Sequence, residues 1–173
     1  MSNDKSTPEH NTQYAELPYR HCVGIALFNS KGQVFLGDRI GHGEDAWQMP
    51  QGGMDDNEDV IECALRELAE ETGVNPDDVE VLDRTRVPLK YDFPVNEIPN
   101  IMGGNYRGQE QIWVALRYDG SDDAIDLLSC GEDMCEFSRW QWHDFDDSLI
   151  DMIVPFKANV YKAVLLTFRN LVS

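Results

Sequence analysis

The sequence predicts a single α/β domain built in layers, and three observations support this prediction. Residues 21–29 (HCVGIALFN) form an almost continuous apolar run, which is typical of a strand buried on both faces. Residues 58–72 and 155–172 instead carry apolar side chains at helical spacing. Strand patterns and helix patterns are mixed along the chain, and this order favours one layered domain.

The other elements follow from the same patterns. A turn at residues 30–32 separates the first strand from a second strand at 33–39, as in a β-hairpin. Proline and glycine interrupt residues 94–107, where we expect either a substrate-binding lid or a plain surface loop. The remaining expected strands cover residues 79–86, 87–93, 109–118, 124–129 and 136–143.

The composition is that of an ordinary globular protein. The chain has 173 residues, of which 42% are hydrophobic, and this is enough for a substantial core. No apolar run approaches the ~20 residues of a membrane span. Residues 1–16 are polar and lack the apolar centre of a signal peptide. We therefore expect a flexible tail at 1–16, one domain at 17–173 and a cytoplasmic location.

Charge and cysteine content exclude two kinds of site. The net charge of −18 argues against an extended nucleic-acid-binding surface, because such surfaces are basic. It does not exclude an acidic substrate, since a bound cation offsets carboxylates locally. Cys130, Cys135 and His143 fit a zinc site poorly, because their spacing is unusual and a fourth ligand is missing.

The helix expected at 58–72 carries an unusual density of acidic residues. Glu67, Glu70 and Glu71 stand at i, i+3 and i+4 and therefore share one face. Such a face is ordinarily a solvated surface. Alternatively, it holds a hard divalent cation such as Mg²⁺ or Mn²⁺, which prefers oxygen ligands. The glutamates alone leave both interpretations open.

The ends of this helix and its buried stripe are also predictable. Asp56 or Asn57 is expected to cap the first turn, and Gly73 suits the left-handed residue after the last turn. Arg66 is placed to hold a neighbouring carboxylate through a bidentate contact. The apolar stripe is expected at Ile61, Ala64, Leu65, Leu68 and Thr72.

The complete spacing carries more information than the glutamates do. It resembles, without substitution, the signature of the Nudix family of hydrolases: Gly52-x5-Glu58-x7-Arg66-Glu67-[aliphatic]-x-Glu70-Glu71-x-Gly73-[aliphatic]. The resemblance implies the Nudix α/β/α sandwich with a mixed β-sheet. It also implies hydrolysis of a phosphoanhydride bond with Mg²⁺ (or Mn²⁺) as cofactor.

The flanking sequence narrows the resemblance to one branch of the family. The run WQMPQGG at 47–53 is similar to the branch of RNA pyrophosphohydrolases and dinucleoside polyphosphate hydrolases. The similarity continues through residues 19–24, 91–94, 107–113, 136–142 and 155–161. The implied substrate is therefore a nucleotide, either a 5′-triphosphate RNA end that loses pyrophosphate or a dinucleoside polyphosphate.

The resemblance implies roles for individual residues. It implies catalytic roles for Arg66, Glu67, Glu70 and Glu71. The implied metal ligands are Glu67, Glu70, Glu71 and, from a distant strand, Glu136. Arg39 and Phe156 match positions that hold the terminal base, and a guanidinium and an aromatic ring suit stacking. The other matching substrate-binding positions are Arg20, Gln51, Gly52, Gly53, Gln109 and Lys157.

Two other functions fit the sequence less well. A non-catalytic nucleotide-sensing Nudix module is the alternative, although its signature would usually be broken. An enzyme that removes mutagenic nucleotides would not explain WQMPQGG.

Several positions depart from the branch. Basic residues common in the branch are replaced by Asp38, Glu110, Ile112 and Ala158. Each change removes positive charge, and we expect them to weaken the hold on long RNA more than on a small substrate.

Overall fold

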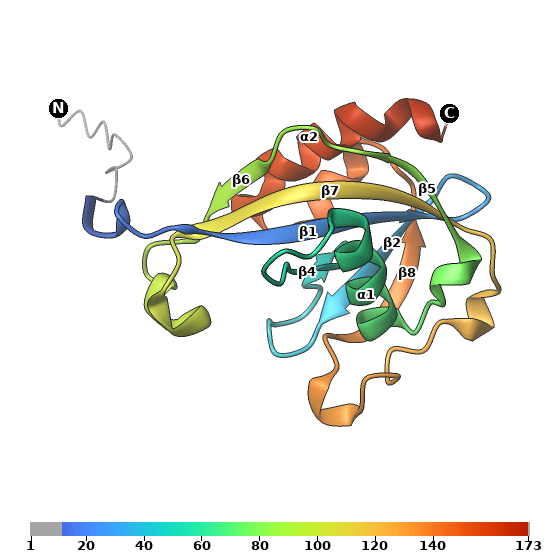
Figure 1. The fold of residues 1–173 in the computed structure, drawn as a ribbon, viewed down its shortest axis with the longest axis horizontal. Coiled ribbons are helices and arrows are strands. Elements are labelled where there is room, and N and C mark those ends of the chain that lie inside the picture. The colour runs from blue at the N-terminus through green and yellow to red at the C-terminus, as the bar shows by residue number, and fades with distance from the viewer. Residues whose placement is uncertain (1–11, 173) are drawn as a thin grey trace, which may run out of the picture.

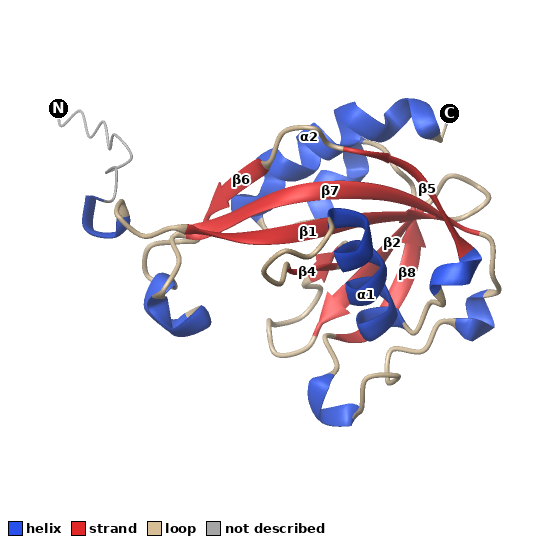
Figure 2. Ribbon diagram, viewed as in Figure 1, coloured by secondary structure: helices blue, strands red, loops and turns tan. Residues whose placement is uncertain are grey.

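A mixed eight-stranded sheet with helices on its two faces forms the computed structural model, which describes residues 12–172 (Figures 1 and 2). At its centre, β1 (Tyr19–Phe28) and β7 (Gly108–Tyr118) run parallel and stay in register along their whole paired length. The other strands are β2 (Val34–Arg39), β3 (Trp47–Gln48), β4 (Gln51–Gly53), β5 (Val79–Arg84), β6 (Leu89–Asp92) and β8 (Phe137–His143).

The sheet order is β3-β2-β1-β7-β5, with β4 paired to β1, β6 to β7 and β8 to β2. All these pairs except β1–β7 are antiparallel, so the sheet is mixed. The predicted α/β class is confirmed. The expected hairpin at 21–39 is also present as β1 and β2.

The two helices, α1 (Val60–Thr72) and α2 (Ala158–Phe168), cover opposite faces of the sheet (Figure 1). In β1, Val23, Ile25 and Leu27 belong to the cluster packed under α1, whereas Ala26 and Phe28 belong to the cluster under α2. These five side chains are at most 1% exposed. Because both faces of β1 are covered, its sequence is a continuous apolar run rather than an alternating one.

The structure corrects the predicted start of α1 and confirms its end. The cap is Asp59, not Asp56 or Asn57, and its carboxylate accepts hydrogen bonds from the backbone of Ile61 and Glu62. Gly73 follows the helix with φ of 70°, the left-handed conformation expected there. The predicted stripe is buried at Ala64, Leu68 and Thr72, partly buried at Ile61 and Leu65, and extended by Cys63.

Two further predictions differ from the structure. Residues 124–129 are not a strand, because Asp126 accepts a hydrogen bond from the backbone of Leu128 and favours a turn. The last helix is shorter than predicted, since it is flanked by 3₁₀ turns at Pro155–Lys157 and Arg169–Leu171. The other 3₁₀ turns are Thr12–Tyr14, Pro76–Asp78, Ile98–Asn100, Met102–Gly104, Asp122–Ala124, Glu132–Met134 and Asp147–Met152.

Most of the predicted tail, residues 1–11, lies outside the described residues, and its boundary stays a prediction. Within the described part, Tyr14 packs against the cluster under α2, and Arg107 donates a hydrogen bond to the carbonyl of Ala15. In residues 12–172, no helix is long and apolar enough to cross a membrane.

The assignment of Asp59 as the N-terminal cap of α1 can be tested by substitution. Replacing Asp59 with Ala is expected to destabilise the protein by about 1 kcal/mol, because two backbone N–H groups lose their acceptor. Urea denaturation followed by circular dichroism measures this difference. The exposed Asp56, which does not cap the helix, gives the matched control Asp56→Ala. Equal losses in the two variants would contradict the assignment of the cap.

Candidate active site

Arg66 joins the start of α1 to the loop before it. Its Nε and Nη2 donate to the two carboxylate oxygens of Glu58, at 2.8 and 2.9 Å, in the bidentate geometry that a guanidinium favours. Nη2 also donates to the carbonyl of Gly53, and Nη1 donates to Glu67 at 3.0 Å. One side chain therefore fixes the loop, the helix and one of the three glutamates relative to each other.

The two glycines of β4 allow other side chains to approach the backbone closely. A Cβ atom on Gly52 would lie 2.0 Å from the carboxyl carbon of Glu67, which real atoms do not reach. A Cβ atom on Gly53 would lie 2.3 Å from the guanidinium of Arg20. Side chains at these positions would therefore displace a carboxylate and a cation that face the same cavity.

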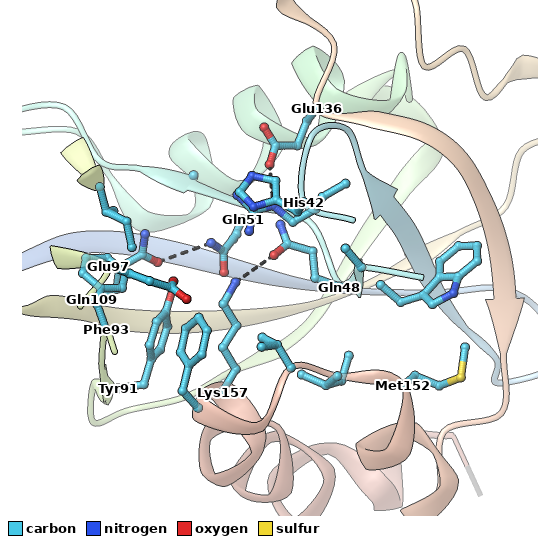
Figure 3. Close-up of a pocket in the computed structure, with 18 of the residues that line it drawn as sticks. His42, Gln48, Gln51, Tyr91, Phe93, Glu97, Gln109, Glu136, Met152 and Lys157 are labelled. Carbon is cyan, nitrogen blue, oxygen red and sulfur yellow. Dashed lines mark hydrogen bonds and ion pairs between the residues drawn. The ribbon is translucent and has the colours of Figure 1, made fainter. Parts of the chain in front are cut away.

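This cavity has a volume of about 830 Å³ and is the candidate active site (Figure 3). Such a volume is usual for small-molecule and cofactor sites. It brings together most of the predicted site residues, namely Arg20, Arg39, Gln51, Gly52, Gly53, Glu67, Glu71, Gln109, Glu136, Phe156 and Lys157. Arg66 lies outside its lining, and the Glu70 carboxylate is 54% exposed and contacts Arg66 only weakly, at 3.4 Å.

Three glutamates give the cavity a strongly acidic end. Burial raises the pKa of Glu71 well above its usual range, and the Glu136 and Glu67 carboxylates raise it further. Burial also raises the pKa of Glu67, although Arg66 partly offsets this effect. Glu136 precedes β8 and forms an ion pair with Arg39 at 3.1 Å. Two elements far apart in sequence thus direct carboxylates into one space.

The donor set fits a hard divalent cation. All three groups are carboxylates, and Oε2 of Glu71 is buried without a hydrogen-bond partner among residues 12–172. Such a buried acceptor is costly unless something binds it. In the described part of the chain, no three acidic, histidine or cysteine side chains converge into a preformed metal cage. Arg66 forms an ion pair with Glu67, and Arg39 forms one with Glu136.

The opposite wall combines aromatic rings with a buried lysine. Lys157 is 3% exposed, and its Nζ donates to Oε1 of Gln48 at 2.8 Å. Burial lowers the pKa of Lys157 to about 7, and the charge of Arg39 adds to this effect. The ring of Phe156 packs against that of Tyr91, with centroids 5.7 Å apart. Phe156 is only partly buried, so one part of its ring is available to the cavity.

The structure adds polar residues that the sequence analysis did not single out. Gln111 donates to Gln51 at 2.9 Å and to Gln109 at 3.0 Å, and it accepts from the indole of Trp113. This buried chain of amides holds Gln51 and Gln109 at the cavity wall. The signal was present in the alternation of Gln109 and Gln111 along β7, where a polar residue on a buried strand requires partners.

The substituted basic positions lie away from this site. None of Asp38, Glu110, Ile112 and Ala158 lines the cavity. Asp38 is buried and binds Arg139 at 2.9 Å and the backbone of Ala46. Glu110 instead pairs with Lys90 and His21. The four substitutions therefore leave the cations of the cavity wall in place.

Comparison with known proteins identifies the family. The profile of the NUDIX domain matches residues 18–164. The chain belongs to the Nudix family. It is 48% identical over 163 residues to an RNA pyrophosphohydrolase of Roseobacter denitrificans, covering 94% of this chain and 98% of the relative. It is equally similar, over 94% and 99%, to an RNA pyrophosphohydrolase of Novosphingobium aromaticivorans. These relatives confirm the predicted class of Nudix pyrophosphohydrolase.

Solved structures confirm the predicted Nudix sandwich. An Ap4A hydrolase of C. elegans aligns with a TM-score of 0.62 at 15% identity, covering 87% of this chain and 98% of that one. The dihydroneopterin triphosphate pyrophosphohydrolase of E. coli aligns with a TM-score of 0.64 at 13% identity, over 87% and 99%. At this identity the likeness concerns the fold.

The contact between Gly52 and Glu67 predicts the effect of one methyl group. Gly52→Ala is expected to lower kcat/KM by about a hundredfold, because it displaces a carboxylate of the cavity. The fold is expected to persist, since the clash is with the end of a side chain. Steady-state kinetics and a thermal melt measure both effects. If the clash acts through Glu67, adding Gly52→Ala to a Glu67→Ala variant causes little further loss.

The ion pair of Arg66 predicts a pH dependence of stability. Hydrogen bonding by Arg66 lowers the pKa of Glu58 from 4.5 to about 2. The ionised carboxylate therefore stabilises the fold above pH 4.5, and this contribution disappears as the pH falls towards 2. Wild type is expected to exceed Glu58→Gln in stability at pH 6 and to approach it near pH 2. Denaturant unfolding across this range measures the difference, and a constant gap would contradict the prediction.

Proposed function

We propose that this chain is a Mg²⁺- or Mn²⁺-dependent enzyme that removes pyrophosphate from triphosphorylated 5′ ends of RNA in the cytoplasm. The observation that carries the proposal is the cavity itself, whose lining combines three carboxylates with cations and aromatic rings. The complete Nudix signature and the RNA pyrophosphohydrolase relatives support the same activity.

Glu67, Glu70, Glu71 and Glu136 are the proposed ligands of the cation. When bound, the cation neutralises charge on the phosphates and helps to generate an attacking hydroxide from water. One glutamate of this group orients or deprotonates the water. Arg66 acts indirectly, because it fixes Glu67 and the loop of Gly53. Glu70 is a proposed ligand from its place on α1, although its exposed side chain does not line the cavity.

The remaining residues that line the cavity are proposed to position the nucleotide. Arg39 and Phe156 are the proposed contacts of the terminal base, since both line the cavity and both present flat groups suited to stacking. Arg20 and Lys157 supply positive charge for the phosphates, and Gln51 and Gln109 supply hydrogen bonds. Because Gly52 and Gly53 have no side chains, they leave space for the phosphate chain beside Glu67 and Arg20.

The positions of the substituted residues remove one argument against an RNA end as the substrate. The loss of basic residues at Asp38 and Glu110 does not alter the cavity, because neither lines it. The net charge of −18 disfavours contacts along a long RNA, so recognition is confined to the first nucleotides. The cavity therefore needs to hold the 5′ end alone.

Glu71 provides the test of the catalytic centre. Glu71→Gln is expected to lower kcat by about a hundredfold or more, because it removes a ligand or base. The fold is expected to remain at least as stable, since a neutral amide avoids burying an ionised carboxylate. Mn²⁺ should raise the melting temperature of wild type but much less that of the variant. Glu62→Gln, on the exposed side of α1, is the matched control. Full activity of Glu71→Gln at saturating Mg²⁺ would contradict its role.

A comparison of substrates tests the specificity. With Mg²⁺, we expect a higher kcat/KM for 5′-triphosphate RNA than for diadenosine tetraphosphate, measured side by side on wild type. A higher value for diadenosine tetraphosphate would favour a dinucleoside polyphosphate hydrolase. Binding of both without turnover, with Mg²⁺ and with Mn²⁺, would favour a non-catalytic nucleotide-sensing module.

A further inference from the structure

A buried amide of the cavity has an unused hydrogen-bond donor. Gln48, in β3, is 2% exposed and lines the cavity. Its Nε2 has no hydrogen-bond partner among the described residues, and it shares this state with only one other buried side-chain atom there, Oε2 of Glu71. Buried donors without partners are rare and costly, so such an atom in a substrate cavity requires an explanation.

The orientation of this amide is fixed by Lys157. A lysine ammonium donates hydrogen bonds and accepts none, so the amide oxygen has to face it. The distance of 2.8 Å between Nζ and Oε1 agrees with this assignment. Figure 3 shows the two side chains reaching towards each other from different walls of the cavity. The amide nitrogen is therefore directed away from Lys157.

The chemistry of the neighbouring groups indicates which kind of ligand accepts the hydrogen bond from Nε2 of Gln48. The amide N–H₂ of Gln48 and the ammonium of Lys157 are both donors, and Lys157 is buried deeply enough to favour an anionic neighbour. The carboxylate end of the same cavity accommodates a cation rather than an anion. A phosphate oxygen that lies between the cation and Lys157 satisfies the unused donor as well.

We propose that Gln48 is a further substrate-binding residue, whose Nε2 donates a hydrogen bond to an oxygen of the 5′ phosphate chain while its Oε1 positions Lys157. This inference rests on the proposed function, because it assigns the ligand of the same site. It distinguishes Gln48 from a residue that serves only to hold the lysine. The phosphate chain is thus bound by one neutral and one cationic donor that are coupled through a single amide.

Binding of inorganic tripolyphosphate to the full chain, measured by calorimetry at fixed Mg²⁺, tests the proposal without requiring turnover. Gln48→Met keeps the side-chain volume but removes both polar atoms, and it should weaken binding about tenfold to a hundredfold. Gln141→Met, a glutamine of β8 outside the cavity, is the matched control and should bind like wild type. Thermal melts establish that each variant is folded.

A Lys157→Met background separates the two functions of the amide. If Gln48 binds phosphate directly, Gln48→Met weakens tripolyphosphate binding in this background as well, by about tenfold. If Gln48 acts only through Lys157, the second substitution has no further effect, and the proposal is overturned. Replacing a buried lysine by methionine leaves no unpaired charge, so the double variant is expected to fold.

Two more outcomes keep this proposal separate from the proposed function. If Gln48→Met weakens binding of 5′-triphosphate RNA but leaves tripolyphosphate unaffected, the donor contacts a base or sugar and the phosphate assignment is overturned. If tripolyphosphate binding depends on Gln48 as expected but wild type does not hydrolyse the RNA, the proposed function fails and the assignment of Gln48 is supported.

Discussion

The repulsion between carboxylates at one end of the cavity is the constraint on which the rest of the site depends. A chain with a net charge of −18 directs Glu67, Glu71 and Glu136 into the same space. Arg66 forms an ion pair with Glu67, and Arg39 forms one with Glu136, so two guanidiniums offset part of the repulsion. Among the described residues Glu71 has no such ion pair, and burial together with the Glu136 and Glu67 carboxylates raises its pKa. The divalent cation proposed for this site would offset the repulsion, and its binding would then be coupled to stability.

Strand pairing in the sheet brings together site residues that are distant in the sequence. Glu136 lies next to Arg39 because β8 pairs with β2, although 97 positions separate them. Gly52 lies against Glu67 because β4 pairs with β1 beneath α1. The second wall comes from the 3₁₀ turn Pro155–Lys157, just before α2, on the other face of the sheet. The cavity therefore draws on both helical layers, and neither wall is complete without the central strands.

How much could be predicted from sequence depended on the range of the interactions involved. A continuous apolar run predicted β1, a turn signal predicted β2 and helical periodicity predicted α1, because these patterns depend only on residues within or next to each element. Such patterns failed at residues 124–129, where the side chain of Asp126 forms a local turn, and at the cap of α1, where neighbouring acidic residues compete. The roles of Gln48 and Gln111 depend on contacts that the sequence pattern does not show. The Lys157 side chain that binds Gln48 lies 109 positions away, and Gln51, which Gln111 holds at the cavity wall, lies 60 positions away.

Position 38 shows that the loss of a basic residue from the sequence need not remove a cation from the site. Arg39 lines the cavity whereas its neighbour Asp38 does not, and the pairing of β2 with β8 is irregular between these two residues. Asp38 binds Arg139, whose guanidinium lies 4.9 Å from the ring of Trp47, and it accepts a hydrogen bond from Ala46. Ala46 and Trp47 lead into Gln48 and themselves line the cavity. An acidic residue at position 38 thus supports β3, the strand that carries Gln48, and it removes no cation from the lining of the cavity.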